Sequence, residues 1–137
     1  MNNSLFFKKL SDNNFRRTSE RLQLFELLAS LDGPQSIADL VKKSQAFADR
    51  STVYRTLDTF EKVGVTTRVY TGWKYKIELS DTFSPHHHHM LCMKCHQVIA
   101  FKESQEFEKE LSKLESQHSF SIKSHTLELQ GICQKCS

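Results

Sequence analysis

The chain has 137 residues, of which 38% are hydrophobic, and its mean hydropathy is -0.51. This length accommodates one ordinary domain or two small ones, and the composition excludes a membrane span. The formal net charge of +3 is too small to indicate nucleic-acid binding by itself, so the positions of the charges matter more than their sum.

Charged and metal-binding residue types separate along the chain at about Ser80. The residues before Ser80 include 13 Lys and Arg against 9 Asp and Glu, whereas the rest include 6 Lys against 7 Asp and Glu. All six arginines lie before Ser80, and all seven histidines and all four cysteines lie after it. Arginine suits bidentate recognition of phosphates and guanines, while histidine and cysteine bind metals. This pattern indicates two modules of different chemistry, although chance clustering within a single domain is an alternative.

The first ten residues lack an apolar core followed by a small-residue cleavage site, so we expect no signal peptide and a cytoplasmic protein. Thiols stay reduced in the cytoplasm. Four cysteines in two Cys-x-x-Cys pairs are therefore predicted to bind a metal rather than to form disulfides.

Four helices are expected in the first module. A short first helix follows Asn3 or Ser4. A second helix, capped by Thr18 or Ser19, carries a stripe of leucines at helical spacing and ends at a Gly-Pro pair. Ser36 is the predicted cap of the third helix.

The fourth helix is predicted over Thr52–Gly64, because apolar residues recur at i, i+4 and i+7 and glycine is a natural stop. The apolar positions are Val53, Leu57 and Phe60. The opposite face is polar, with Tyr54 at its edge, and it carries Thr52, Arg55, Thr56 and Thr59.

Two β-prone runs, Val65–Tyr70 and Lys74–Leu79, follow this helix and are joined by a short turn. Helices followed by a hairpin predict a winged helix-turn-helix, whose recognition helix enters the major groove of DNA. Tyr54 and Arg55 are then candidate base or phosphate contacts. A helix packed inside an ordinary domain would show the same apolar stripe, but the arginine bias and the hairpin favour the winged helix.

Ser80–Pro85 is a polar stretch that predicts a hinge. Beyond it we expect two strands, a helix, and a strand or hairpin, over 86–91, 97–101, 103–118 and 119–129. Phe107, Leu111 and Leu114 would face inward from this helix. The predicted fold class is therefore α+β, with a winged-helix domain, a hinge and a small α/β metal-binding domain over 1–79, 80–85 and 86–137.

Two Cys-x-x-Cys sequences form the strongest motif, Cys92/Cys95 and Cys133/Cys136. Four thiolates at about 2.3 Å around a tetrahedral Zn²⁺ make a closed structural site. Because residues 96–132 separate the pairs, the metal would hold together a strand-helix-strand unit and supply on the order of 10 kcal/mol of apparent folding free energy. A redox-active Cys-x-x-Cys is the alternative, but such dithiols do not come with a matched second pair.

A run of four histidines, His86–His89, precedes the first cysteine pair. Successive side chains on a strand point to opposite faces, so His86 and His88 would face one way and His87 and His89 the other. One run can then supply two separate metal sites. An exposed polar strip is the alternative.

Further candidate ligands are weaker when taken singly. Carboxylates such as Glu78 and Glu108 would shift the preference of a histidine site toward harder ions. His118 and His125 are individually weak, because a lone histidine is more often a structural residue.

Four motifs occur together in this chain: Ser51-Thr52-Val53-Tyr54-Arg55-x-Leu57, the histidine run with Cys92-x-x-Cys95, the pair His118 and His125, and Cys133-x-x-Cys136. In this combination, from about Phe15 to Ser137, the chain resembles the ferric uptake regulator (Fur) family. The resemblance implies a homodimeric, metal-sensing transcriptional repressor. Its winged helix would bind palindromic operators in double-stranded DNA, and its C-terminal domain would dimerise and bind metal.

The resemblance also implies roles for single residues. Structural Zn²⁺ would be held by Cys92, Cys95, Cys133 and Cys136. A regulatory site beside the hinge, for Zn²⁺, Fe²⁺ or Mn²⁺, would use Glu78, His87 and His89. An additional metal site would use His86, His88, Glu108 and His125. The DNA-binding residues would be Arg17, Arg21, Ser51, Thr52, Tyr54 and Arg55.

Two departures from the family pattern bear on the metal. Iron-type members commonly contribute a histidine just before the third helix, where this chain has Gly33-Pro34-Gln35-Ser36. His88 stands where iron-type members often carry aspartate, which is more similar to zinc-sensing (Zur-type) members. We therefore expect control of zinc uptake genes, with iron, manganese or peroxide sensing on the same fold as the alternative.

The resulting hypothesis is that metal at His87 and His89 fixes the hinge. The metal would thereby set the spacing of two recognition helices in a dimer and act as a corepressor. The rival from another class is an enzyme, a thiol oxidoreductase or a metallohydrolase. A hydrolase needs an open coordination position and a general base, and nothing in the sequence marks a substrate pocket.

Overall fold

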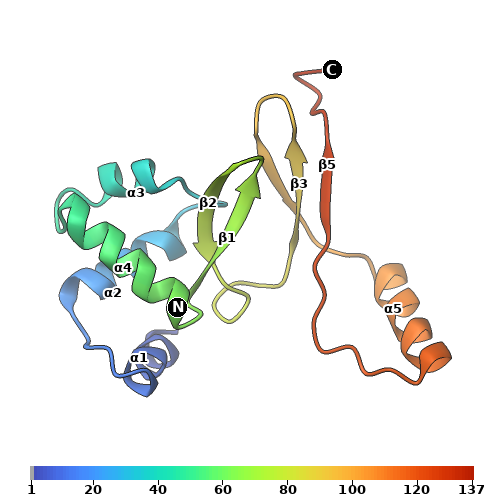
Figure 1. The fold of residues 1–137 in the computed structure, drawn as a ribbon, viewed down its shortest axis with the longest axis horizontal. Helices are drawn as coiled ribbons and strands as arrows, with labels where there is room; N and C mark the ends of the chain where they lie inside the picture. The colour runs from blue at the N-terminus through green and yellow to red at the C-terminus, as the bar shows by residue number, and fades with distance from the viewer. Residues whose placement is uncertain (1) are drawn as a thin grey trace. The chain divides into compact units, whose positions relative to one another are not determined.

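The computed structural model describes residues 2–137, which divide into two compact units (Figure 1). The first unit ends at Pro85, and the second comprises His86–Ser137. All the arginines belong to the first unit, and all the histidines and cysteines belong to the second. No helix in the described part of the chain is long and apolar enough to cross a membrane.

Four helices build the first unit, and a polar residue caps the start of each. They are α1 (Asn3–Asp12), α2 (Ser19–Ser30), α3 (Ile37–Lys43) and α4 (Arg50–Lys62). Each cap accepts a hydrogen bond from the backbone N–H three residues on, and the caps are Asn2, Thr18, Ser36 and Asp49. The predicted caps Thr18 and Ser36 are confirmed. The first helix starts earlier than predicted, because Asn2 rather than Asn3 or Ser4 caps it.

Phenylalanine rings from three helices form the centre of the first core. Phe6 of α1 stacks on Phe25 of α2 with 4.3 Å between ring centroids, and it meets Phe60 of α4 edge-on at 5.5 Å. All three side chains are fully buried. Since burial of apolar surface is the main favourable term in folding, this cluster holds α4 against α1 and α2.

Helix α4 buries a broader face than its apolar residues define. Val53, Leu57 and Phe60 are buried as predicted. Thr56 and Thr59 were expected on the exposed face, but both are buried. A threonine can be buried there because its hydroxyl bonds within the helix, as Thr59 Oγ1 does by donating to the Arg55 carbonyl at 3.1 Å.

The wing is the hairpin of β1 (Thr66–Thr71) and β2 (Lys74–Leu79), which follows directly on α4. Gly64 ends the helix with a φ of +78°, and the Val65 N–H donates to the Phe60 carbonyl at 2.8 Å, as in a Schellman motif. Gln35 forms a two-hydrogen-bond bridge with Ile77 of β2. The predicted winged helix-turn-helix is confirmed.

The predicted hinge begins as a packed turn of the first unit. The Ser80 hydroxyl donates to the Gly64 carbonyl at 2.7 Å, and the Ser80 N–H donates to the Val65 carbonyl at 2.9 Å. The Phe83 ring lies edge-on to Phe25 with 5.1 Å between centroids. Residues 80–83 are therefore fastened to the first core, and the boundary between the units follows Pro85.

The second unit contains a three-stranded sheet in the order β4-β3-β5 and one helix. Its elements are β3 (His88–Cys92), β4 (Val98–Phe101), α5 (Gln105–His118) and β5 (Glu128–Gly131). Strand β3 pairs antiparallel with β4 and parallel with β5. The parallel pairing brings the segments that carry the two cysteine pairs to the same end of the sheet.

Two expectations for this unit were wrong. No residue of α5 is buried within the chain, and Leu114, expected to face inward, is 47% exposed. Residues 119–127 form no strand, and the left-handed Ser119, with a φ of 50°, ends α5. Phe107 contacts the His88 and His125 rings and is half-buried, as Leu111 is, but nothing in the described chain covers Leu114 to the same extent.

Candidate metal centres and nucleic-acid interface

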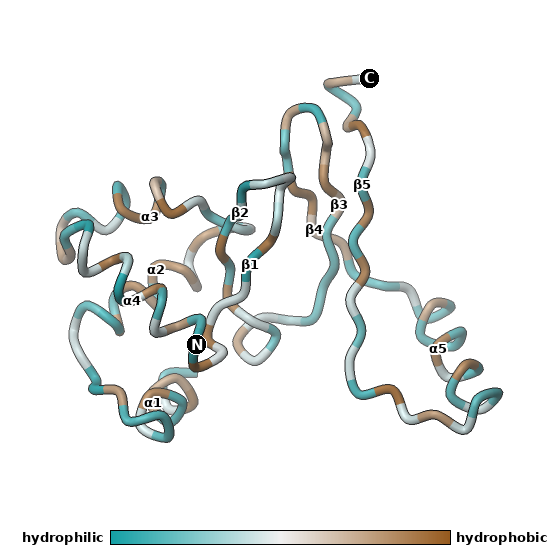
Figure 2. The backbone as a smooth tube through the Cα atoms, viewed as in Figure 1, coloured by the Kyte–Doolittle hydropathy of each residue, from teal (hydrophilic) through white to brown (hydrophobic). Residues whose placement is uncertain are grey.

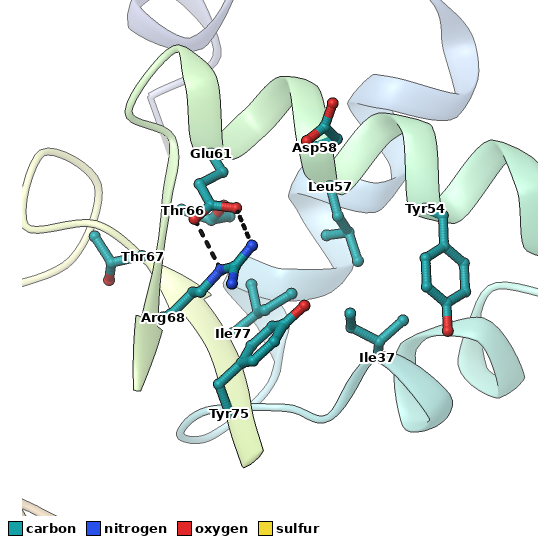
Figure 3. A pocket seen from close by; sticks show the side chains of 10 residues that line it. All are labelled: Ile37, Tyr54, Leu57, Asp58, Glu61, Thr66, Thr67, Arg68, Tyr75 and Ile77. Atoms are coloured by element: carbon teal, nitrogen blue, oxygen red, sulfur yellow. Dashed lines mark hydrogen bonds and ion pairs between the residues drawn. The ribbon is translucent and has the colours of Figure 1, made fainter. Parts of the chain in front are cut away.

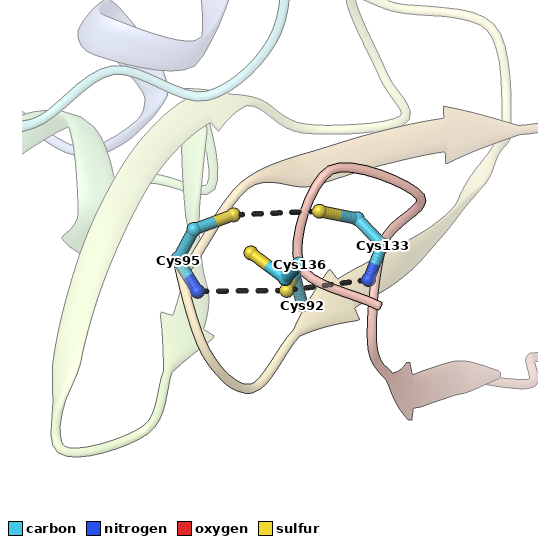
Figure 4. A group of neighbouring side chains, drawn as sticks. All are labelled: Cys92, Cys95, Cys133 and Cys136. Carbon is cyan, nitrogen blue, oxygen red and sulfur yellow. Dashed lines mark hydrogen bonds between the residues drawn. The ribbon is translucent and has the colours of Figure 1, made fainter.

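The four cysteines converge at one end of the second sheet (Figure 4). Cys92 ends β3 and Cys95 lies in the turn after it, while Cys133 and Cys136 lie in the turn after β5. Their Sγ atoms all lie within 4.8 Å of one another, and Cys95 Sγ is 3.7 Å from Cys133 Sγ. Sulfurs 2.3 Å from a tetrahedral Zn²⁺ would be about 3.8 Å apart, so the donor set fits this ion.

The backbone prepares one of these sulfurs to be a thiolate. The N–H groups of Cys95 and Cys133 donate to Cys92 Sγ at 3.5 and 3.4 Å, and they lower the pKa of Cys92 to about 5. Hydrogen bonding with the Cys133 thiol, followed by burial, raises the pKa of Cys136 to about 12. A bound dication would displace the remaining thiol protons, because cysteine binds metals as the thiolate.

A second set of donor atoms, from three histidines and one glutamate, converges elsewhere in the second unit. His125 Nε2 lies 3.1 Å from His86 Nε2, 3.2 Å from His88 Nε2 and 2.8 Å from Glu103 Oε2. His88 Nε2 is also 2.7 Å from that carboxylate oxygen. His88 is 3% exposed, so this cluster of three imidazoles and one carboxylate is partly withdrawn from water. Such a donor set suits borderline divalent metals such as Zn²⁺ and Fe²⁺.

The carboxylate in this cluster is Glu103 rather than Glu108. Glu108 is exposed in the first turn of α5 and does not belong to the converging group. Phe101 pairs with His88 across the β3–β4 ladder, and Glu103 follows two residues later on the side that faces His88. Strand alternation puts Glu103 on the same side as Phe101, but the pairing of Phe101 with His88, which brings that side to the histidines, is not visible in the sequence.

We expect that Glu103→Ala weakens divalent metal binding to this cluster, whereas Glu108→Ala leaves the binding unchanged. The reason is that only the first variant removes a donor atom from the converging group. Isothermal titration of the protein with its cysteine site already loaded measures the difference. Equal losses in the two variants would contradict the assignment of Glu103.

His87 and His89 lie apart from that cluster. Their rings are 4.8 Å apart between centroids and nearly perpendicular. Glu78, their predicted partner, lies on β2 of the first unit. Its approach to His87 and His89 stays a prediction. His118, in the last turn of α5, is exposed and belongs neither to the cysteine cluster nor to the cluster of His86, His88, Glu103 and His125.

The exposed side of α4 carries the predicted DNA-binding residues. Ser51, Tyr54 and Arg55 are exposed at and after its N-terminus, and Thr52 is half-buried. The Arg50 guanidinium lies over the Tyr54 ring at 5.7 Å from its centroid. The N-terminal end of a recognition helix is the part that reaches base edges, and DNA contact by these exposed residues stays a prediction.

Two further predicted DNA-binding residues are held by aromatic rings next to α2. The guanidinium of Arg17 lies 4.6 Å from the centroid of Phe7, and that of Arg21 lies 5.5 Å from the centroid of Phe15. Arg21 also donates to the Arg16 carbonyl at 2.6 Å. Cation–π contact restricts these side chains while leaving their charge available to a phosphate.

The cap of α4 gives the first unit a pH-dependent stability. Hydrogen bonds from the Thr52 side chain and N–H lower the pKa of Asp49. Because the folded pKa is lowered, the stabilisation is complete above the unfolded value of about 3.9 and is lost as the pH falls through the folded value. We expect Asp49→Ala to lower the urea midpoint at pH 7, and by less at pH 3. Asp49→Asn retains an uncharged cap and serves as the control; an Asp49→Ala deficit that is equal at both pH values would contradict the account.

Comparison with known proteins places the chain among close structural relatives. A model of the ferric uptake regulator family matches residues 12–130. The ferric uptake regulation protein of Campylobacter upsaliensis is 32% identical over 140 residues, which cover 96% of this chain and 86% of that protein. The solved ferric uptake regulator of Vibrio cholerae has a TM-score of 0.70 at 30% identity, covering 92% of this chain and 98% of its own. The regulator of Pseudomonas aeruginosa, solved with manganese, has a TM-score of 0.74 at 26% identity, with 93% and 96% covered.

A winged helix joined to a unit with clustered metal-ligating side chains defines a metal-responsive DNA-binding regulator. The chain belongs to the ferric uptake regulator family, and it is therefore a transcription regulator and not an enzyme. The oxidoreductase and metallohydrolase alternatives are accordingly not favoured.

Proposed function

We propose that this protein is a cytoplasmic, homodimeric repressor that binds palindromic operators in double-stranded DNA when a divalent metal is bound. The observation that carries this proposal is the convergence of His86, His88, Glu103 and His125 within hydrogen-bonding distances. Four donor atoms at one point form a ready binding site for a dication, and metal at this unit would make DNA binding responsive to metal supply.

Structural Zn²⁺ at the cysteine cluster is the second part of the proposal. Its residues would be Cys92, Cys95, Cys133 and Cys136. This ion would join the ends of β3 and β5, and it would add folding free energy that a small unit cannot obtain from its own core.

The regulatory ion would bind at His87 and His89, with Glu78 as a ligand from the other unit. Ser80 and Phe83 fasten the start of the connecting segment to the first core, which supports a pivot near Pro85. An ion bridging His87, His89 and Glu78 would restrict that pivot and so select one orientation of the recognition helices. The change that the ion makes in the free energy of DNA binding would equal the difference between its binding free energies for that orientation and for the others.

Exposed apolar side chains on the second sheet support a homodimer. Met90, Ile99, Leu129 and Ile132 line a shallow groove and are 38% to 55% exposed. Along β3 the residues change from hydrophilic to hydrophobic, and along β5 hydrophilic and hydrophobic residues alternate (Figure 2). In the described chain β5 pairs with β3 alone, which leaves an open strand edge that a second copy would cover. Light scattering of the zinc-loaded protein measures the mass directly.

We propose zinc as the effector and the repression of zinc uptake genes as the task. The imidazoles of His87 and His89 suit zinc as donors, and His88 takes the place of the aspartate of many iron-type members. Iron is the second candidate, because the relatives of about 30% identity are named ferric uptake regulation proteins. The test is operator binding by protein with its cysteine site loaded, titrated anaerobically with Zn²⁺, Fe²⁺ and Mn²⁺. Zinc is expected to promote binding at the lowest free concentration.

A further inference from the structure

A groove between the recognition helix and the wing lies wholly within the first unit (Figure 3). Its volume is about 130 Å³. Apolar side chains, including Ile37, Leu57 and Ile77, line one part of it, and charged and aromatic side chains of α4 and the hairpin line the other. The charged part joins the last turn of α4 to the middle of β1.

The charged part is a two-point ion pair between Glu61 and Arg68. Arg68 Nε lies 2.8 Å from Glu61 Oε1, and an Arg68 terminal nitrogen donates to Glu61 Oε2 at 3.0 Å. The guanidinium also lies over the Tyr75 ring of β2, 4.2 Å from its centroid. Arg68 therefore contacts α4 through the N–H groups of its guanidinium and the second strand of the wing through the flat face of the guanidinium (Figure 3).

This geometry differs from that of an ordinary surface ion pair. Flexible exposed ion pairs contribute little to stability. A planar guanidinium that meets a carboxylate at two points and also stacks on a ring has few other conformations open to it. The side chains of Arg68 and Glu61 are 37% and 43% exposed, so the pair is partly screened from water. By contrast, the neighbouring pair of Asp58 and Lys62 stays within α4 and is more than 60% exposed on both sides.

We propose that Glu61, Arg68 and Tyr75 form a latch that fixes the wing relative to the recognition helix, so that Arg68 acts as a positioning residue and not as a phosphate contact. The inference rests on the proposed DNA binding. Backbone bonds already hold the hairpin at Val65, where it leaves α4, and at Ile77, the ladder partner of Arg68, which Gln35 bridges. The latch adds side-chain contacts of Arg68 to Glu61 and to Tyr75, which lies two residues beyond Ile77 toward the turn that carries Trp73.

Two charge-matched variants separate this role from simple electrostatics. Glu61→Gln and Asp58→Asn each remove one negative charge from α4, but only the first opens the latch. The DNA probe is a duplex selected from a random-sequence pool with the wild-type protein and Zn²⁺. Glu61→Gln is expected to bind it roughly threefold to tenfold more weakly with an unchanged salt dependence, and Asp58→Asn is expected to bind at least as well as the wild type. Arg68→Lys keeps the charge but loses the fork, and it is expected to match Glu61→Gln.

Trp73 provides a readout that does not depend on DNA. It is the single tryptophan of the chain and is 87% exposed in the turn of the wing. Its fluorescence anisotropy is expected to fall in Glu61→Gln and Arg68→Lys and to stay unchanged in Asp58→Asn, because only the first two free the hairpin.

Three results would overturn the latch. The first is unchanged Trp73 anisotropy in Glu61→Gln. The second is tighter DNA binding by Glu61→Gln, with a logarithmic salt slope steeper by about one, since Arg68 would then be a phosphate contact. The third is wild-type behaviour of Arg68→Lys. A wild-type protein that selects no duplex overturns the proposed function instead, and the anisotropy comparison still decides whether the latch exists.

Discussion

Replacing Cys92 with serine is expected to unfold the second unit and abolish its tightly held zinc. Cys92 is the buried member of the cysteine cluster, and its sulfur accepts hydrogen bonds from both of the turns that carry the other three cysteines. Structural zinc sites supply on the order of 10 kcal/mol of apparent folding free energy, which exceeds what a unit of His86–Ser137 gains from its small core. Circular dichroism on heating and the zinc content after dialysis measure the two effects.

A matched control lies next to the cluster. His96 follows Cys95, is exposed and has a φ of 64°, a conformation that asparagine tolerates. His96→Asn is therefore expected to keep one tightly held zinc and the wild-type unfolding transition. Full zinc retention and unaltered unfolding in Cys92→Ser would contradict a structural role for the site.

Replacing both His87 and His89 with alanine is expected to abolish the effect of metal on operator affinity while leaving the fold intact. These side chains are the proposed link between the bound ion and the segment at Pro85. Without them the ion has no preference for one orientation of the DNA-binding unit, and a ligand without such a preference shifts no equilibrium. Fluorescence anisotropy of labelled operator DNA, with and without added metal, measures the loss.

The adjacent pair supplies the comparison for this variant. The double variant His86→Ala, His88→Ala removes the same number of imidazoles from the same run. These two imidazoles are donors of the cluster that contains Glu103 and His125. We expect the His86/His88 variant to lose metal from that cluster and the His87/His89 variant to retain it. Metal-dependent operator binding of wild-type strength in the His87/His89 variant would refute the proposed regulatory site.

The first unit follows closely from the sequence, because its signals are local. The caps Thr18 and Ser36, the stop at Gly64 and the hairpin after it each depend on residues within a few positions. The exposure of Thr56 and Thr59 was mispredicted, because a threonine that bonds its own helix can be buried like an apolar residue.

The second unit was less predictable, because its contacts are remote or lie outside the chain. The spacing of the cysteines indicated one shared site, and the structure brings all four together. Choosing Glu103 over Glu108 required the register between β3 and β4, which the sequence alone does not provide. The sequence shows an apolar stripe on α5, but no residue of this helix is buried in the described chain.

The most direct test of the account is the affinity of the zinc-site-intact protein for operator DNA across a titration of free divalent metal. We expect weak binding without the second metal and binding that strengthens by at least tenfold as Zn²⁺ occupies the histidine sites, on the order of 1.4 kcal/mol or more of coupling. Equal operator affinity with and without added Zn²⁺, Fe²⁺ or Mn²⁺ would contradict it.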